Sequence, residues 1–518
     1  MSFKRKSFLP GLPGALLVIF TLALIVTLLA GGTALAENVL RTRARNGQDI
    51  VTLDPAHMIG NEEDNIGLAI YSRLIEYDPD NPGETRLDAA EEFEISDDGL
   101  EYYFRLREGI QFHDGYGELT AEDVKFTYER VADPELDAPY KDDFATLEEV
   151  EVIDRYSGRI ILSDPFPGLL TRTLPLLRGS ILSKEAFEDI GEERFATNPI
   201  GSGPYQFVEW QPGEKIILTR NEDYYRELPD FTRVEIFPIV EEPAAEVAFD
   251  TGELNETRIS LESIERYEAQ EDVNLENLDL LRFAWIGFNH QLPPFDDIKV
   301  REAMRYAIDV DEIIAGAYQG ATDRANTLIA PGVLGHWEDA PAYEQDLDRA
   351  RELLEEAGYP DGFRTELATY AVPVELNSSQ IAQFHLTRVG VNADLRIVES
   401  GQGYEVISDE ERPGMHFASF TLNPDPGYWT EWFTNAQIGS WNYMHWENDE
   451  FSRLHDEANI TTDPEKRAEF YVQMQQIMDE DVAFIPISYD IGVHASRDFM
   501  RPVYLFHYSL YQFFELVE

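Results

Sequence analysis

The stretch YYFRLREGIQFHDGYGELTAEDVKFTYERV, residues 102–131, contains two different periodicities next to each other. Apolar and polar residues alternate over Tyr102–Leu106, which predicts a strand. The HDG sequence at residues 113–115 then predicts a turn. Thr120 followed by Asp123 is an acidic variant of a capping box and predicts the start of a helix. A strand, a turn and a capped helix in one segment indicate a fold that mixes helices and strands.

The same mixture extends along the chain in both directions. Helical spacing of apolar residues occurs at Leu119–Arg130, Val300–Ala317, Asp348–Glu356 and Pro464–Glu480. Alternation typical of strands occurs at Glu151–Leu162, Lys215–Leu218, Arg233–Ile239 and Ala393–Val398. These segments predict an α/β or mixed α+β architecture. One core rarely serves a chain of this length, and no Gly/Ser-rich or Pro-rich linker occurs, so we expect two or more lobes joined by crossing strands.

The N-terminal segment has the layout of a secretory signal peptide. Basic residues at 4–6 precede an apolar run from about Leu9 to Ala30 and the small-residue triplet Ala34-Leu35-Ala36. The alternative is a membrane anchor, because the apolar run is long enough to span a bilayer. The A-x-A site favours cleavage after Ala36. The chain has no cysteine, which excludes a cysteine-linked lipid anchor, disulfides and thiolate metal sites. We therefore expect a free periplasmic protein.

Charge excludes one class of partner. The sequence has 41 basic and 99 acidic residues, a net charge of −58, and loss of the three basic residues of the leader gives −61. Nucleic acid binding needs a basic surface, so we expect no such partner. With 43% hydrophobic and 12% aromatic residues, the chain is expected to be folded rather than disordered. An acidic surface of this kind predicts adaptation to high salt, where charges are screened over about 3 Å at 1 M.

Several strings resemble one known family in order and spacing. Beside residues 102–131, they are TLDPAH (52–57), GSGPYQFVEWQPGEKIILTRNEDYY (201–225), GFNHQLPPFDDIKVREAMRYAID (287–309), RARELLEEAGYPDGF (349–363) and NYMHWENDEFSRLHDEANITTDPEKRAEFYVQMQQIMDEDVAFIPISY (442–489). They resemble blocks of the peptide, nickel and oligosaccharide binding proteins of ABC importers, the family 5 extracellular solute-binding proteins. The resemblance covers nearly all of the chain after the leader.

This resemblance implies a two-lobe periplasmic-binding-protein fold with a hinge-linked cleft. The expected division is a signal peptide at 1–36, a first lobe at 37–280 with an extra subdomain at about 71–175, a second lobe at 281–484, and a return to the first lobe at 485–518. The implied function is to capture a small organic solute, peptide-like, between the lobes and deliver it to the permease subunits of an ABC importer. We expect a monomer, no enzymatic activity and no cofactor.

The resemblance also places the ligand site. In the peptide binders an aspartate just before a Pro-Asp-Pro-like loop pairs with the ligand's ammonium group, and the matching stretch here is SFTLNPDPGYW, residues 419–429. Leu422 stands at the position of that aspartate. A buried ammonium without a counter-charge is costly, so either another acid such as Asp425 replaces it or the ligand is not a conventional peptide. Asp425 between prolines also favours bonds to its own turn.

Further candidate contacts lie in and around this stretch. Trp429, with Tyr428 and Trp432, forms an aromatic cluster that serves either the core or a flat ligand surface. The complete set of candidate binding residues is Asn61, Asn289, His416, Ser419, Leu422, Asn423, Asp425 and Trp429. Asn61 aligns with a loop that lines the cleft in relatives, whereas a lone histidine such as His416 is more often a surface residue or a satisfied interior residue than a ligand.

Other functions have less support. No G-x-S-x-G, H-E-x-x-H, Walker or dinucleotide motif occurs. A pair of carboxylates could serve a glycosidase, but in a chain with 99 acidic residues such a pair arises by chance. A secreted hydrolase is therefore the weakest alternative. His445, His455, His494 and His507 lack tight metal-ligand spacing, and no metal site is predicted. An oligosaccharide or opine-like ligand is the stronger alternative, and a nickel chelate remains open as well.

Overall fold

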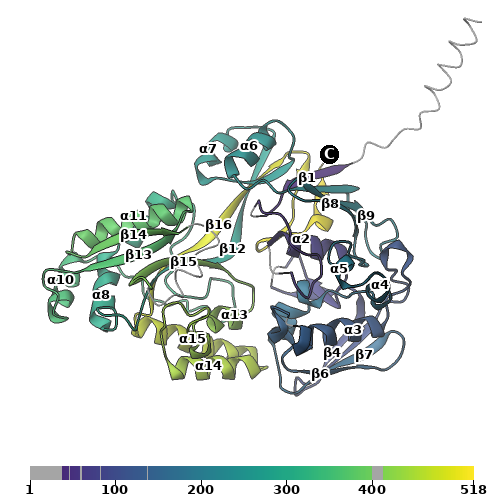
Figure 1. The fold of residues 1–518 in the computed structure, drawn as a ribbon, viewed down its shortest axis with the longest axis horizontal. Helices are drawn as coiled ribbons and strands as arrows, with labels where there is room; N and C mark the ends of the chain where they lie inside the picture. Colours follow the sequence, from purple (N-terminus) through teal and green to yellow (C-terminus); the bar gives the residue numbers. More distant parts are fainter. Residues whose placement is uncertain are drawn as a thin grey trace, which may run out of the picture.

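The computed structural model describes residues 38–517 apart from 46, 59–60, 82, 137 and 399–411. The predicted leader lies outside the described residues. Within the described ranges, no helix has the length and hydropathy of a membrane-spanning segment. Two lobes stand side by side, and long strands run from one to the other (Figure 1).

One sheet extends through both lobes. It has ten strands in the order β14-β13-β15-β12-β16-β11-β1-β10-β9-β8. The central pair is β12 (Val273–Phe288) and β16 (Phe484–Arg497), which run antiparallel over most of their length. We call residues 38–272 and 498–517 the first lobe and residues 289–483 the second lobe. The lobes are thus joined by crossing strands, as the sequence predicted; the predicted boundaries near residues 280 and 484 remain a prediction.

The first lobe contains most of the short strands. Its strands are β1 (Val39–Arg43), β2 (Ile75–Tyr77), β3 (Thr85–Leu87), β4 (Ala90–Ile95), β5 (Glu101–Leu106), β6 (Leu147–Val152), β7 (Ser157–Leu162), β8 (Tyr205–Gln211), β9 (Lys215–Arg220), β10 (Arg233–Phe237) and β11 (Glu256–Ile259), with β17 (Met500–Arg501), β18 (Tyr504–Leu505), β19 (Tyr508–Ser509) and β20 (Glu515–Leu516) from the C-terminal segment. Its helices are α2 (Asn61–Ile70), α3 (Ala121–Ala132), α4 (Lys184–Ile190), α5 (Glu192–Phe195), α6 (Glu242–Asp250) and α7 (Ile264–Glu268). Strands β4, β5, β7 and β6 form a separate sheet at the end remote from β12 and β16 (Figure 1).

The second lobe is mainly helical around the other end of the long sheet. Its strands are β13 (Arg364–Tyr370), β14 (Asn392–Val398) and β15 (Met415–Thr421). Its helices are α8 (Ile298–Ala307), α9 (Val310–Ala317), α10 (Leu347–Glu356), α11 (Pro373–Thr387), α13 (Pro426–Glu431), α14 (Asp449–Ile460) and α15 (Pro464–Glu480). Two buried apolar clusters lie in this lobe, one of which includes Ile286 and the other Trp285, neighbours that point to opposite faces of β12.

Residues 102–131, which first indicated a mixed fold, connect β5 to α3 and contact α4. Tyr102, Phe104 and Leu106 of β5 are buried, as the alternation predicted. Thr120 donates from its backbone N and its Oγ1 to Asp123 Oδ2 at 2.9 and 2.8 Å, so the predicted acidic cap opens α3. Asp123 Oδ1 also accepts from the backbone N of Lys184 at 3.0 Å, which ties α3 to α4.

Glycine allows this segment to approach α2 closely. Gly203 donates its backbone N–H to the Ile70 carbonyl at the end of α2 at 2.7 Å. A Cβ atom on Gly201 would lie 2.1 Å from the same Ile70 oxygen. The Gly201 carbonyl accepts from the His113 N–H at 2.8 Å, so the turn at 113–115 and the GSGP turn pack on one helix end. The glycines in GSGP therefore serve close backbone packing.

Candidate functional site

The cleft between the lobes contains a cavity of about 300 Å³. The first lobe lines it from α2, from residues 140–143 and 172–178, and from the C-terminal segment at 507–508, and the second lobe lines it with residues 419–432. The complete lining is Asp64, Tyr140, Asp143, Arg172, Leu176, Leu177, Arg178, Ser419, Phe420, Thr421, Leu422, Asn423, Tyr428, Trp432, His507 and Tyr508. A molecule held here would touch both lobes.

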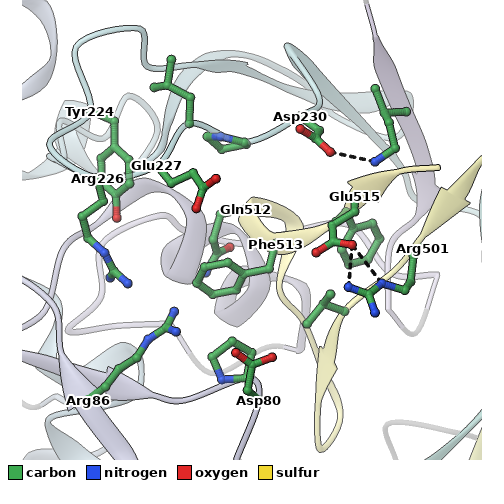
Figure 2. A pocket seen from close by; sticks show the side chains of 16 residues that line it. Asp80, Arg86, Tyr224, Arg226, Glu227, Asp230, Arg501, Gln512, Phe513 and Glu515 are labelled. Carbon is green, nitrogen blue, oxygen red and sulfur yellow. Dashed lines mark hydrogen bonds and ion pairs between the residues drawn. The ribbon is translucent and has the colours of Figure 1, made fainter. Parts of the chain in front are cut away.

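A second hollow, of about 420 Å³, lies within the first lobe alone (Figure 2). Residues 79–86, 224–230 and 501–516 supply its walls. Its charged groups bond to the chain itself: Arg501 Nη2 donates to Glu515 Oε2 at 2.5 Å, and Asp230 Oδ2 accepts from the backbone N of Leu516 at 2.8 Å (Figure 2). Closure of the two lobes would leave this hollow unchanged, so it is a weaker candidate than the cleft.

Three predicted residues line the cleft cavity. Ser419 stands on β15, where its Oγ accepts from Arg282 Nη2 at 2.5 Å and donates to Glu375 Oε1 at 2.6 Å. Leu422 is buried, and its backbone N donates to Leu281 at 2.8 Å. Asn423 Oδ1 accepts from the backbone N of Asp425 at 3.0 Å. The wall at the expected position of the amine-binding aspartate is therefore apolar.

Asp425 and Trp429 lie behind this wall. Asp425 Oδ1 caps α13 by accepting from the Gly427 N–H at 2.8 Å, and both Asp425 oxygens lie 3.0 Å from Arg467 Nη2. The Arg467 guanidinium keeps the pKa of Asp425 below its ordinary value although burial opposes this. Trp429 is fully buried in the core, and its Nε1 donates to the Asn423 carbonyl at 2.6 Å. Asp425 and Trp429 thus fix the cavity wall from behind and are absent from its lining.

The remaining three candidates are Asn289, His416 and Asn61. The first two are absent from the cavity lining, and the side chain of the third is not described by the structure. Asn289 follows β12, and its Oδ1 accepts from the Gln291 N–H at 3.2 Å, as a turn residue does. His416 is buried on β15, and burial lowers its pKa to about 4. Asn61 begins α2, but its side chain lies outside the described part of the structure.

Aromatic side chains form the part of the second-lobe wall next to Leu422. The Trp432 ring centroid lies 3.9 Å from that of Phe420 and 5.8 Å from that of Tyr428. All three residues line the cavity. The sequence pointed to this cluster but selected Trp429 rather than Trp432. Helical geometry fits the difference, because Tyr428 and Trp432 are four residues apart and share one side of α13 and its end, whereas Trp429 follows Tyr428 by one residue and is turned into the core.

Sequence reasoning missed the charged residues of the first-lobe wall. Asp64 lies in the first turn of α2, and burial raises its pKa to about 6, with Arg178 and Arg45 opposing the shift. Arg178 donates to the carbonyls of Pro55 and Met58, both at 2.9 Å, and its guanidinium stacks 3.9 Å from the Tyr140 ring. One signal pointed to the arginine that acts on Asp64 from outside this lining: Arg41, Arg43 and Arg45 alternate in a chain poor in basic residues.

The two lobes already touch beside the cavity. Thr171 Oγ1 of the first lobe donates to Asp425 Oδ2 at 2.5 Å. Arg172 Nη1 lies 3.2 Å from Glu431 Oε2, while Arg172 Nε lies 3.1 Å from Asp143 Oδ1 of its own lobe. These polar contacts join residues 171–172 to α13 across the cleft.

Acidic and histidine side chains that could bind a metal ion are bound to other side chains of the protein instead. Asp54, His57 and Glu192 lie close together, but Arg130 donates to Asp54 Oδ1 and Oδ2 at 3.0 and 2.7 Å and to Glu192 Oε1 at 2.9 Å. This guanidinium thus already occupies oxygens of both carboxylates. Two of the C-terminal histidines lie in separate networks: His494 pairs with Glu256 at 2.6 Å, and His455 Nδ1 lies 2.8 Å from Thr430 Oγ1.

Known proteins match most of the length of this chain. The dipeptide-binding protein of Escherichia coli K12 is 29% identical over 83% of this chain and 85% of its own length. The periplasmic binding protein DppA of Helicobacter pylori, solved with the peptide STSA, has a TM-score of 0.79 at 26% identity and covers 92% of this chain and 97% of that one. MoaA from A. tumefacien R10, solved with mannopinic acid, has a TM-score of 0.78 at 26% identity and covers 92% and 98%.

These solved structures are binding proteins of ABC transporters or of the periplasmic class, and their fold confirms the predicted two-lobe periplasmic-binding-protein architecture. Residues 84–441 match the family described as bacterial extracellular solute-binding proteins, family 5 Middle. The match extends over more than half of the sequence. This protein therefore belongs to the family 5 bacterial extracellular solute-binding proteins, as its sequence blocks indicated.

Proposed function

We propose that this protein is the extracytoplasmic solute-binding component of an ABC importer and that it holds a peptide-like organic solute in the cleft cavity. The observation that carries the proposal is that both lobes line this cavity. A ligand that contacts both lobes binds the closed arrangement more tightly than an open one and shifts the population toward it. A permease can then distinguish the loaded protein from the empty one.

Relatives support a peptide as the solute. The E. coli relative is named a dipeptide-binding protein, and the H. pylori neighbour holds the peptide STSA. An opine-like ligand is the alternative, supported by the mannopinic acid complex and by Leu422 in place of the expected aspartate. In either case Phe420 and Trp432 would offer a flat apolar surface to part of the ligand.

Strand β12 contains a feature suited to a hinge. Its pairing with β16 shifts register between Asp279, opposite Ile491, and Arg282, opposite Asp490. Leu281, within the shift, has a φ of 47°, a left-handed conformation that a bulky residue rarely adopts. Bulges bend strands and change the direction of the chain beyond them. We place the hinge here, between the strand halves that pair with each lobe.

Export and oligomeric state complete the proposal. We propose that residues 1–36 direct secretion and are removed, so that the protein works in the periplasm as a monomer. The acidic composition supports function at high salt, where the repulsion between surface carboxylates is screened. Binding and release require no enzymatic step.

Ligand-induced stabilisation tests the proposal. The protein starting at Glu37 would be screened by thermal shift in high salt against di- to pentapeptides, amino acids, opines, oligosaccharides and nickel. A ligand at 100 times its Kd adds about 2.7 kcal/mol to the free energy of unfolding. X-ray scattering should then show a smaller radius of gyration with the stabilising solute. If no solute in the panel raises the melting temperature, the proposal is contradicted.

A matched pair of variants locates the site. Trp432→Ala removes an aromatic wall of the cavity and should weaken the binding of the stabilising solute by roughly tenfold. Phe499→Ala removes an exposed ring outside the cavity lining and should leave affinity unchanged. Equal affinities of the two variants would place the ligand elsewhere.

A further inference from the structure

A second, smaller cavity of about 50 Å³ adjoins the first within the cleft and shares Thr421 and His507 with it. Its lining is Arg43, Ala44, Arg45, Glu256, Arg258, Arg282, Thr421, His494, His507 and Ser509, and we call it the arginine pocket. Four arginines against one glutamate reverse the balance of a chain that has 41 basic and 99 acidic residues. Glu256 is itself bonded to His494 at 2.6 Å and to the Tyr504 hydroxyl at 2.9 Å.

Two of these arginines are fully used by the fold. Arg282 donates to Ser419 Oγ and to Glu375 Oε1 at 3.0 Å, and its Nε lies 3.5 Å from Asp490. Arg43 donates to the carbonyls of residues 239 and 240, both at 2.6 Å. Their charges hold together β12, β15 and the end of β1, so they leave little capacity for a ligand.

The other two arginines lack a full set of partners. The Arg45 guanidinium lies 5.8 Å from the centroid of the Tyr508 ring, and its buried Nη1 has no hydrogen-bond partner among the described residues. Arg258 has Glu242 at 3.6 Å from its Nε, and Arg43 shares that carboxylate at 4.0 Å. Burial lowers the pKa of Arg45 to about 10 and lowers that of Arg258, because both cations have lost water without gaining equivalent partners.

The adjoining main cavity contains a carboxylate, Asp64, that also lacks bonded partners within the described residues. Among the described residues, none donates a hydrogen bond to the Asp64 carboxylate and none forms an ion pair with it. Arg178 and Arg45 both oppose the rise of its pKa, but the Arg178 guanidinium is committed to two backbone carbonyls and to the Tyr140 ring, and Arg45 forms no ion pair with Asp64 within the described residues. Asp143, the other acid of the lining, is paired with Arg172 at 3.1 Å. Asp64 is thus the lining carboxylate that can accept a cation.

We propose that Asp64 and Arg45 select a short peptide with two free ends, Asp64 binding its ammonium group and Arg45, assisted by Arg258, binding its carboxylate. Asp64 would then perform, from the first lobe, the role of the aspartate that Leu422 replaces in the second. Each desolvated charge gains a partner when the peptide binds, so its end groups stabilise the loaded cleft more than any apolar contact alone. This inference rests on the proposed function and names its substrate class.

Blocked peptides provide the test. The protein would be incubated with three randomised libraries of di- to pentapeptides, one with free ends, one N-acetylated and one C-amidated, and bound peptides quantified by mass spectrometry and calorimetry. The unmodified protein should bind free peptides roughly 30-fold or more tightly than either blocked form. Asp64→Asn should lose the discrimination against N-acetyl peptides and retain that against amides. Arg45→Gln should show the reverse pattern.

The hollow in Figure 2 supplies matched controls. Asp80→Asn and Arg501→Gln change a lining carboxylate and a lining arginine of that hollow and should retain both discriminations. A misfolded variant would lose all binding, whereas the proposal requires loss of one discrimination only. Equal binding of free and blocked libraries, or unchanged discrimination in Asp64→Asn and Arg45→Gln, overturns the proposal.

The outcomes separate this inference from the function on which it rests. If the protein binds an opine or an oligosaccharide and none of the peptide libraries, the peptide assignment fails while solute capture in the cleft survives. If no solute of any class binds, the proposed function fails and the inference falls with it.

Discussion

Asp425 and Asp64 show how differently two aspartates near one cavity can behave. Asp425 stood beside the site in the sequence, but Arg467 and the turn of α13 consume both of its oxygens. Asp64 lies in the first turn of a helix far away in the sequence, and the fold brings it to the cavity. The sequence could locate Ser419, Leu422 and Asn423 because they stand just before the recognisable Pro-Asp-Pro loop at residues 424–426. It could not locate Asp64, because the lack of a hydrogen-bond partner for its carboxylate among the described residues depends on contacts distant in the chain.

Ligand affinity should depend on pH through Asp64. Its pKa of about 6 in the empty protein lies above the ordinary 3.8, and the charges that act on it are Arg178, Arg45 and Glu63. An ammonium partner favours the carboxylate, so binding a free-ended peptide lowers this pKa and releases a proton near pH 6. Affinity for the peptide should fall by about tenfold as pH falls from 7 to 5. Calorimetry across this range measures the change.

The same variant provides a stability check with a defined sign. A carboxyl group with a raised pKa in the folded state favours folding at low pH and opposes it once pH rises through about 6. Asp64→Asn should therefore raise the free energy of unfolding at pH 7 by about 1–3 kcal/mol, measured in urea, and flatten the pH dependence of affinity. Asp80→Asn is the control and should change neither. A destabilised Asp64→Asn protein would show that Asp64 has a structural partner.

At the scale of elements, regular periodicity was predictable and local breaks were not. Pro464–Glu480 forms α15 as predicted, and Asp348–Glu356 lies within α10. The predicted helix 300–317 is two helices, because Asp309 accepts from the Glu312 N–H at 3.0 Å and starts α9 anew. The predicted strand 151–162 is likewise not one strand but parts of two, the end of β6 and all of β7. Asp154 accepts from the backbone of Tyr156 and Ser157 and makes a hairpin of β6 and β7.

The cap of α3 should contribute more than an ordinary helix cap. Asp123 binds the backbone and hydroxyl of Thr120 and also the backbone N of Lys184, and it is buried. Asp123→Ala leaves these donors without partners and should lower the free energy of unfolding by about 2–3 kcal/mol. Glu122→Ala alters the exposed neighbouring position in the same turn and should cost less than about 0.5 kcal/mol. Chemical denaturation compares them, and equal losses would contradict the role of Asp123.

At the scale of the molecule, charge sets the conditions of folding. A net charge of −58 on one chain produces self-repulsion that salt screens. The melting temperature should rise by several degrees between 0.05 and 2 M NaCl, more steeply than in sucrose of equal osmolality, which does not screen charge. A melting temperature that responds equally to NaCl and sucrose would remove the electrostatic explanation and the expected adaptation to high salt.

Polar contacts across the cleft should bias the lobes toward closure. The Arg172–Glu431 pair and the Thr171–Asp425 bond join residues 171–172 of the first lobe to α13, which lies on the side of the second lobe nearer the first lobe (Figure 1). Arg172 keeps its Asp143 partner when Glu431 is neutralised, so Glu431→Gln removes the ion pair between the lobes without leaving an unpaired cation, and the Thr171–Asp425 bond remains. The loss should be about 1 kcal/mol, or roughly fivefold in the closing equilibrium.

Because the proposed solute binds the closed form more tightly, its affinity should fall by the same factor in Glu431→Gln, and the radius of gyration of the empty protein in X-ray scattering should increase. Glu450→Gln is the matched control, because its partner Arg453 lies on the same helix and is half-exposed, so neither quantity should change. The two measurements must move together. A weaker peptide affinity with an unchanged radius of gyration would mean that Glu431 contacts the ligand itself. The closing equilibrium would then be set by the bulge in β12 rather than by the polar contacts between residues 171–172 and α13.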